Sequence, residues 1–149
     1  MKKLELTIQK SDILSDVSLA SAYAGVKGGT GETGYYERVS TTDTDAELLG
    51  RFWSDMCGVV FSRFREFITS SATGNDRFTL EMTLSGSYDE SLTPSVKGDI
   101  LSAVTAGVIA RWFRYSLPAR SAEWEAEAEE LLKRAHGKLC TRRPPSRPF

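Results

Sequence analysis

An apolar stripe with helical spacing runs from Leu49 to Phe67 and is the strongest structural constraint in the sequence. Its members recur every three or four residues, which is the pattern of a helix that faces a protein core. Thr44 or Asp45 can cap this helix, and Glu47 lies in the first turn, where the helix dipole favours an anion. We therefore predict a helix over about residues 44–68 that is central in the domain or also contacts another subunit. The residues that widen its apolar surface beyond one stripe are Phe52, Val59, Phe61 and Ile68.

Two other segments alternate apolar and polar residues, which is the period of a half-buried strand. A turn signal at Gly74 and Asn75 precedes the second of them. We predict that the two strands pair into a small two-stranded antiparallel sheet covered by helices, because such a sheet is marginal alone. Its outer edges can also accept a strand from a neighbouring subunit. The apolar positions are Leu4, Leu6 and Ile8 in the first strand, and Phe78, Leu80, Met82 and Leu84 in the second.

Three further segments have helical patterns, at residues 13–24, 95–117 and 121–139. The second is apolar enough to be buried, and its small residues Ala103, Ala106, Gly107 and Ala110 permit close helix approach. The third begins with five glutamates and ends with basic residues, an asymmetry that matches the helix dipole. We predict a mostly helical α+β fold of about four helices and a two-stranded sheet. Its parts are one domain at residues 1–140, a mobile glycine-rich loop at 28–43, and an extended basic tail at 141–149.

Overall composition excludes some partners and compartments. The 149 residues carry a net charge of −1, so the chain as a whole attracts neither nucleic acid nor an anionic membrane. Cys57 and Cys140 are expected to be free thiols in a reducing compartment. Neither a signal-peptide run nor the 18 or more apolar residues of a membrane span is present in the sequence. We expect a protein made in a cytoplasm and kept there unless a larger particle exports it.

The residues that usually carry chemistry fail specific requirements. The single histidine, His136, has basic sequence neighbours, which favour a solvated helix end over a catalytic role. One histidine and two distant cysteines do not supply a zinc site. The glycine-rich run after Gly25 has Lys27 ahead of its other glycines, which is the wrong order for a phosphate-binding loop. Asp89 and Glu90 are expected to be turn and capping groups before a helix. We predict no enzyme, no cofactor and no metal site.

The contacts of a non-catalytic protein are then expected at its apolar flanks, its loop and its tail. The tail has no acid from residue 131 onward, and it can contact protein, bind nucleic acid without sequence specificity, or stay uninvolved. The glutamates of the last helix are either a solvated face or an acidic docking patch. The candidate protein-interface residues are Tyr35, Tyr36, Phe52, Phe61, Arg142, Arg143, Arg147 and Phe149.

The segment from Tyr88 to Pro148 resembles a family of small, functionally uncharacterised proteins of phages and prophages of gut bacteria. The resemblance rests on a YDESLTPSV opening, an apolar helix that ends in Trp112 and Phe113, a Glu/Ala-rich helix and a basic Arg/Pro tail. An ELLGRFWSDM-like helix at Glu47–Met56 adds to it. The architecture also looks like that of the head–tail connector (neck adaptor) proteins of tailed phages, which is a likeness at fold level.

The resemblance implies a virion structural protein, with no catalytic residue to transfer. As a connector subunit the chain is expected to assemble into a ring with copies of itself and to contact other phage neck, portal or tail proteins. Non-specific DNA contact through the tail is an alternative, and no membrane partner is implied. A tail-completion or tail-terminator role remains open, because the 28–43 loop has no connector signature.

Overall fold

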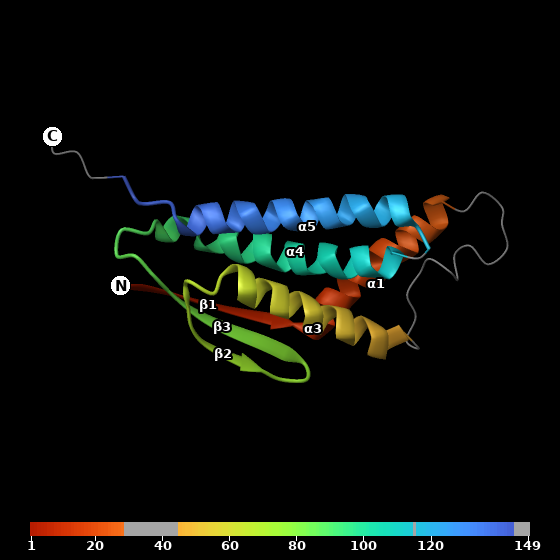
Figure 1. The fold of residues 1–149 in the computed structure, drawn as a ribbon, viewed down its shortest axis with the longest axis horizontal. Helices are drawn as coiled ribbons and strands as arrows, with labels where there is room; N and C mark the ends of the chain where they lie inside the picture. Colours follow the sequence, from red (N-terminus) through yellow and green to blue (C-terminus); the bar gives the residue numbers. More distant parts are fainter. Residues whose placement is uncertain (29–44, 115, 145–149) are drawn as a thin grey trace.

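The computed structural model describes residues 1–28, 45–114 and 116–144 (Figure 1). Strands and helices alternate at first, and the chain ends in two long antiparallel helices. The predicted loop at 28–43 lies outside the described residues apart from Gly28, which ends the first helix. The elements in chain order are β1 (Lys2–Gln9), α1 (Lys10–Gly28), α3 (Ala46–Arg63), β2 (Ile68–Thr73), β3 (Arg77–Leu84), the short 3-10 helix η2 (Glu90–Leu92), α4 (Thr93–Phe113) and α5 (Pro118–Leu139).

The sheet has three strands in the order β1-β3-β2, all antiparallel. The predicted pairing of the first strand with residues 78–84 is confirmed, and it brings Leu6 opposite Leu80. The alternating apolar residues of both strands are buried. The predicted number of two strands is wrong, because β2 pairs with the other side of β3.

The missed strand also shortens the predicted helix at 44–68, since α3 ends at Arg63. Phe64 is fully buried just beyond the helix, while Phe67 and Ile68 are half-buried and lead into β2. These aromatic residues continue the helical stripe in the sequence, so periodicity alone extends the helix too far. The hairpin turn at Gly74 connects β2 to β3, with the Gly74 amide donating to the Arg77 carbonyl at 2.8 Å.

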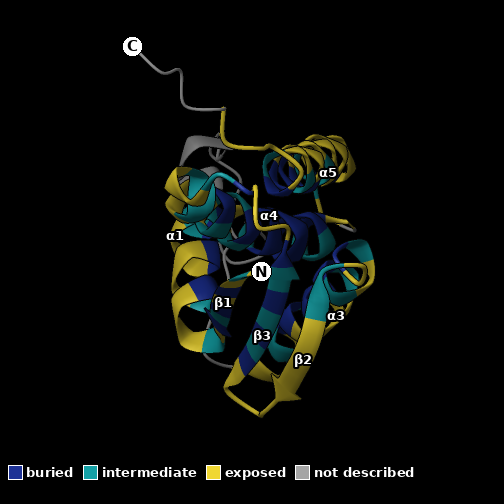
Figure 2. Ribbon diagram, turned by 90° about the vertical axis from the view of Figure 1, so that its left-hand side faces the viewer, coloured by how far each residue is buried: buried dark blue, intermediate teal, exposed yellow. Residues whose placement is uncertain are grey.

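The helices cover one face of the sheet in two layers (Figures 1 and 2). Helix α4 lies at the centre, where it contacts α1, α3 and β1, and α5 packs along its outer side. Ten of the α4 residues are buried, in agreement with the predicted buried helix. The core therefore lies between α4 and the inner face of the sheet, and α5 forms the outer layer.

Small residues on α4 allow the predicted close approach. A Cβ atom on Gly107 would lie 2.3 Å from the Met56 sulfur of α3, so any larger residue there would require the Met56 side chain to move. At the turn into α5, the buried Ser121 hydroxyl donates to the Ala110 carbonyl at 2.6 Å. At the opposite end, Lys138 of α5 pairs with Asp99 of α4 at 2.7 Å. These contacts fix α5 along α4.

Candidate interaction surfaces

The start of the basic tail is held against the loop that precedes η2. Tyr88 is buried, and its hydroxyl lies 3.0 Å from the Thr93 hydroxyl. The backbone of Arg142 forms an antiparallel bridge with Tyr88, and the Arg143 amide donates to the Ser87 carbonyl at 2.7 Å. Both arginine side chains are exposed. The backbone bridge thus fixes the point at which the tail departs from the domain. The guanidinium groups of Arg142 and Arg143 stay accessible to a partner.

The other predicted interface residues divide into two groups. Phe52 and Phe61 lie on α3, half-buried and packed against the core cluster. The exposed part of each ring is the surface that a partner can contact. The residues that lie outside the described part of the chain are Tyr35, Tyr36, Arg147 and Phe149.

A groove of about 380 Å³ separates α3 from β2. Its wall includes Phe61, together with Cys57 and with Ser71 of β2. Trp53 also lines it, and the buried Nε1 of Trp53 has no hydrogen-bond partner among the described residues. A buried donor without an acceptor costs about 1–3 kcal/mol.

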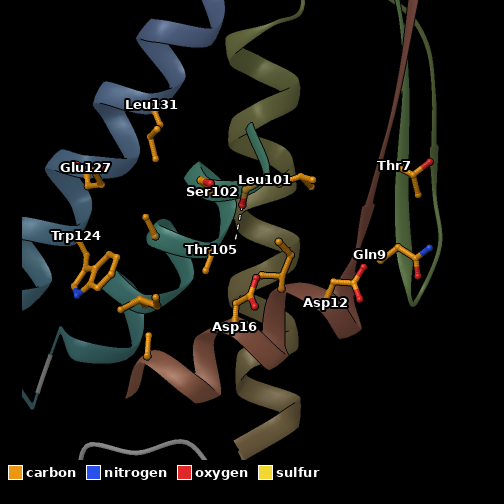
Figure 3. Close-up of a pocket in the computed structure, with 14 residues that line it drawn as sticks. Thr7, Gln9, Asp12, Asp16, Leu101, Ser102, Thr105, Trp124, Glu127 and Leu131 are labelled. Carbon is orange, nitrogen blue, oxygen red and sulfur yellow. Dashed lines mark hydrogen bonds between the residues drawn. The ribbon is translucent and has the colours of Figure 1, made fainter. Parts of the chain in front are cut away.

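A second cleft, of about 370 Å³, lies where β1, α1, α4 and α5 meet (Figure 3). Asp12 and Asp16 stand one turn apart on α1, and Trp124 and Glu127 face the cleft from α5. The α4 side includes Thr105, whose hydroxyl donates to the Leu101 carbonyl of the same helix at 3.1 Å. Trp124 is half-buried at this cleft. Asp16 of α1 and Glu127 of α5 are 111 residues apart in sequence, so no local motif could reveal the site.

The glutamate-rich start of α5 is largely solvated, with one specific contact. Glu129 accepts a hydrogen bond from the Arg63 guanidinium of α3 at 2.7 Å. This hydrogen bond holds the pKa of Glu129 below its ordinary value and raises that of Arg63. Both side chains are at least one-third exposed, so the pair contributes no more than about 1 kcal/mol.

The residues that invited a catalytic interpretation have structural partners. Asp89 caps η2, because its carboxylate accepts hydrogen bonds from the amide and hydroxyl of Ser91. These hydrogen bonds hold the pKa of Asp89 below its ordinary value, in agreement with the predicted capping role. Glu90 pairs with Lys2 at 3.5 Å.

His136 is less solvated than the sequence predicted. Its ring stacks on Phe64 with centroids 6.1 Å apart and contacts Phe67 at 5.4 Å. It also pairs with the carboxylate of Glu66, and its side chain is 35% exposed. The histidine therefore packs α5 against the segment between α3 and β2.

The two thiols are expected to react very differently. Cys57 is buried in α3, and this burial raises the pKa of its thiol to about 12, whereas Cys140 is exposed. Because the thiolate is the reactive form, a disulfide reagent such as Ellman's reagent should modify one thiol per native chain within minutes at pH 8. Cys140→Ser should abolish this fast phase, and Cys57→Ser should leave it intact. Rapid modification of both thiols in the native protein would contradict the burial of Cys57.

Two further properties hold for residues 1–28, 45–114 and 116–144. None of the helices there is long and apolar enough to cross a membrane. No group of three or more His, Cys, Asp or Glu side chains among these residues could hold a metal ion. Comparison with family models, curated proteins and solved structures found no match.

Proposed function

We propose that the chain is a non-enzymatic virion protein of a phage, a head–tail connector (neck adaptor) subunit that assembles into a ring. Its partners are then copies of itself and the neighbouring neck, portal or tail proteins. The resemblance of residues 88–148 to small phage proteins supports the viral part of the proposal. The surfaces of the described fold support the assembly part.

The observation that carries the proposal is the outer edge of β2. This strand lies at the edge of the sheet, and five of its six residues are exposed. Its sequence, ITSSAT, contains no charge and no proline. Proteins that avoid strand addition usually blunt an edge with lysine, proline or a bulge. The one irregularity of β2 lies at its start, between Ile68 and Ser70, so the rest of the strand is suited to pairing with a neighbouring copy.

The groove beside β2 supports the same assignment. A segment added at this edge would run past Ser71 and Thr73, which line the groove. Its side chains would come near the side of α3 that lines the groove, which includes Cys57 and Phe61. These contacts would add to the backbone hydrogen bonds that a new strand makes.

A lysine at position 72 should test this edge. Ala72 pairs directly with Thr79 of β3, so the two side chains lie on the same outer face of the sheet, one on the edge strand and one on the central strand. We expect Ala72→Lys to weaken self-association about tenfold or more, because strand addition would desolvate the charge. Size-exclusion chromatography with light scattering, over a range of protein concentrations, measures the change.

Thr79→Lys is the matched control, because it adds the same charge to the same face away from the edge. The control should associate as the unaltered chain does. If the unaltered chain is a strict monomer that joins no neck, portal or tail protein, the proposed function is wrong. If both lysine variants associate normally, β2 is not the contact.

A tail-completion or tail-terminator role would use the same ring at a different place in the particle, and binding to tail-tube rather than portal protein would favour it. The exposed Arg142 and Arg143 favour one other candidate, non-specific DNA contact. That function requires affinity for a DNA duplex that falls steeply with salt.

A further inference from the structure

We infer that the cleft between α1, α4 and α5 receives the basic tail, residues 141–149, of a second copy of this chain. The inference rests on the proposed function, since it names one of the contacts that would join neighbouring subunits. It concerns a different surface from the β2 edge, so the two can be tested separately.

The cleft is lined by acidic side chains. Three carboxylates, those of Asp12, Asp16 and Glu127, line it, and all three residues are exposed. Among the described residues, none of the three forms an ion pair, although acids elsewhere on the surface are paired with Lys2, Lys3, Arg63 and Lys138. The cleft is therefore a concentrated negative site whose counter-charges must come from a different molecule or from solvent.

The cleft combines an apolar floor with an aromatic wall. Its floor is apolar, with Ile13, Ala106 and Ile109 buried beneath it, and the half-buried indole of Trp124 forms part of one wall. An aromatic face beside carboxylates binds guanidinium groups well, because arginine stacks on the ring while its N–H groups reach the carboxylates. Proline rings also pack on tryptophan, as they do in aromatic grooves that bind extended Pro-rich segments. This combination favours an Arg/Pro peptide over a small inorganic cation.

The tail is complementary to the cleft in charge. Its sequence, TRRPPSRPF, contains three arginines, three prolines and no acid. The charge of three arginines balances that of the three cleft carboxylates. Proline-rich segments are already extended when free, so less conformational entropy is lost on binding.

The described start of the tail lies far from the cleft of its own chain. The bridge between Arg142 and Tyr88 holds the start of the tail at the C-terminal end of α5, and the described tail runs away from the helices (Figure 1). Glu127 lies 12 residues before Leu139, about 18 Å back along the helix. Arg142 and Arg143 therefore cannot enter the cleft of their own chain. A cleft and a tail at separate places on one subunit form a head-to-tail contact, which closes into a ring when the rotation permits.

Charge reversal tests the inference in the full-length chain. The cleft variant is Asp16→Lys with Glu127→Lys, and the tail variant is Arg142→Glu, Arg143→Glu and Arg147→Glu. Each alone should weaken self-association by at least about tenfold at low salt. An equimolar mixture should also associate, because the intact tail of one variant meets the intact cleft of the other and the two reversed surfaces attract each other. A chain carrying all five changes should regain association.

The matched control is Asp55→Lys with Glu125→Lys. Glu125 lies two residues from Glu127 on the same helix but lines a different cavity, between α3 and α5. The control chain has the same charge as the cleft variant and should associate normally. If the control loses association to the same extent, net charge rather than the cleft is responsible and the inference is wrong. If the five-fold variant stays dissociated, the cleft and the tail do not pair, and the inference is also wrong.

Cross-linking locates the contact directly. A photoreactive amino acid replaces Phe149, and ¹⁵N-labelled and unlabelled full-length chains are mixed before irradiation. We expect mixed-label cross-links to the tryptic peptides 4–10, 11–27, 98–111 or 121–133, which contain the cleft residues of β1, α1, α4 and α5. Cross-links within one chain, or to any other peptide, would overturn the inference while leaving the ring itself intact. Absence of any oligomer would instead remove the proposed function on which the inference rests.

Discussion

Replacing Leu132 by alanine is expected to lower the free energy of unfolding by about 2–5 kcal/mol. Leu132 lies on α5, where it is 1% exposed within the core cluster. Truncation removes buried apolar surface and leaves a cavity that the packed helices fill only in part. In a two-state chain of this size, the melting temperature should fall by roughly 5–15 °C. Thermal and urea unfolding followed by circular dichroism measure both quantities.

Leu19→Ala is the matched control for this prediction. Leu19 is also a helical leucine, but it is 77% exposed on α1. The same truncation there should change the stability by no more than about 0.5 kcal/mol. Equal losses for the two variants would mean that α5 does not pack on α4 as described. A large loss for Leu19→Ala alone would mean that a partner or another part of the chain covers that leucine.

Replacing Lys138 by methionine is expected to cost about 1–3 kcal/mol. The Lys138 ammonium lies 2.7 Å from the Asp99 carboxylate and 2.5 Å from the Ser95 hydroxyl. The Asp99 side chain is only 13% exposed, so loss of the lysine leaves a largely buried charge without a counter-charge. The cost is smaller than for a fully buried pair because the lysine side chain remains 24% exposed to water. Denaturant unfolding at pH 7 measures it.

The double variant Asp99→Asn with Lys138→Met should recover much of this loss, since it leaves no uncompensated charge. Lys3→Met is the surface control, because Lys3 and its partner Glu81 are 71% and 40% exposed. We expect less than about 1 kcal/mol from that change. If Lys138→Met costs no more than Lys3→Met, the link between α4 and α5 is only a surface ion pair.

Helix and strand positions were the part of the fold that sequence patterns predicted best. The period of two in residues 4–9 and 78–84 predicted both strands and their pairing, because only one face of each could be buried. The small residues of α4 predicted the close packing that Gly107 makes with Met56. The helix limits were less accurate, since Phe64 and Phe67 continue the stripe of α3 after the helix has ended.

Strand β2 was missed for a physical reason. Its polar residues bury little side-chain surface, so they leave no periodic signal. The strand is held by backbone hydrogen bonds to β3, which any residue except proline can make. The predicted turn at Gly74 was correct. Only β3, after the turn, has an alternating apolar pattern, and a pattern on one side of a turn does not identify a hairpin.

By itself, the sequence determined which residues form the core and which helices and strands they build, because periodicity dictates the face that leaves water. It also predicted an extended basic tail at residues 141–149. Tertiary structure alone decided where that tail is anchored, through the bridge between Arg142 and Tyr88. It alone brought Asp12 and Asp16 of α1 to the same cleft as Glu127 of α5. Such sites depend on how helices far apart in the chain cross, and local patterns contain no information about that geometry.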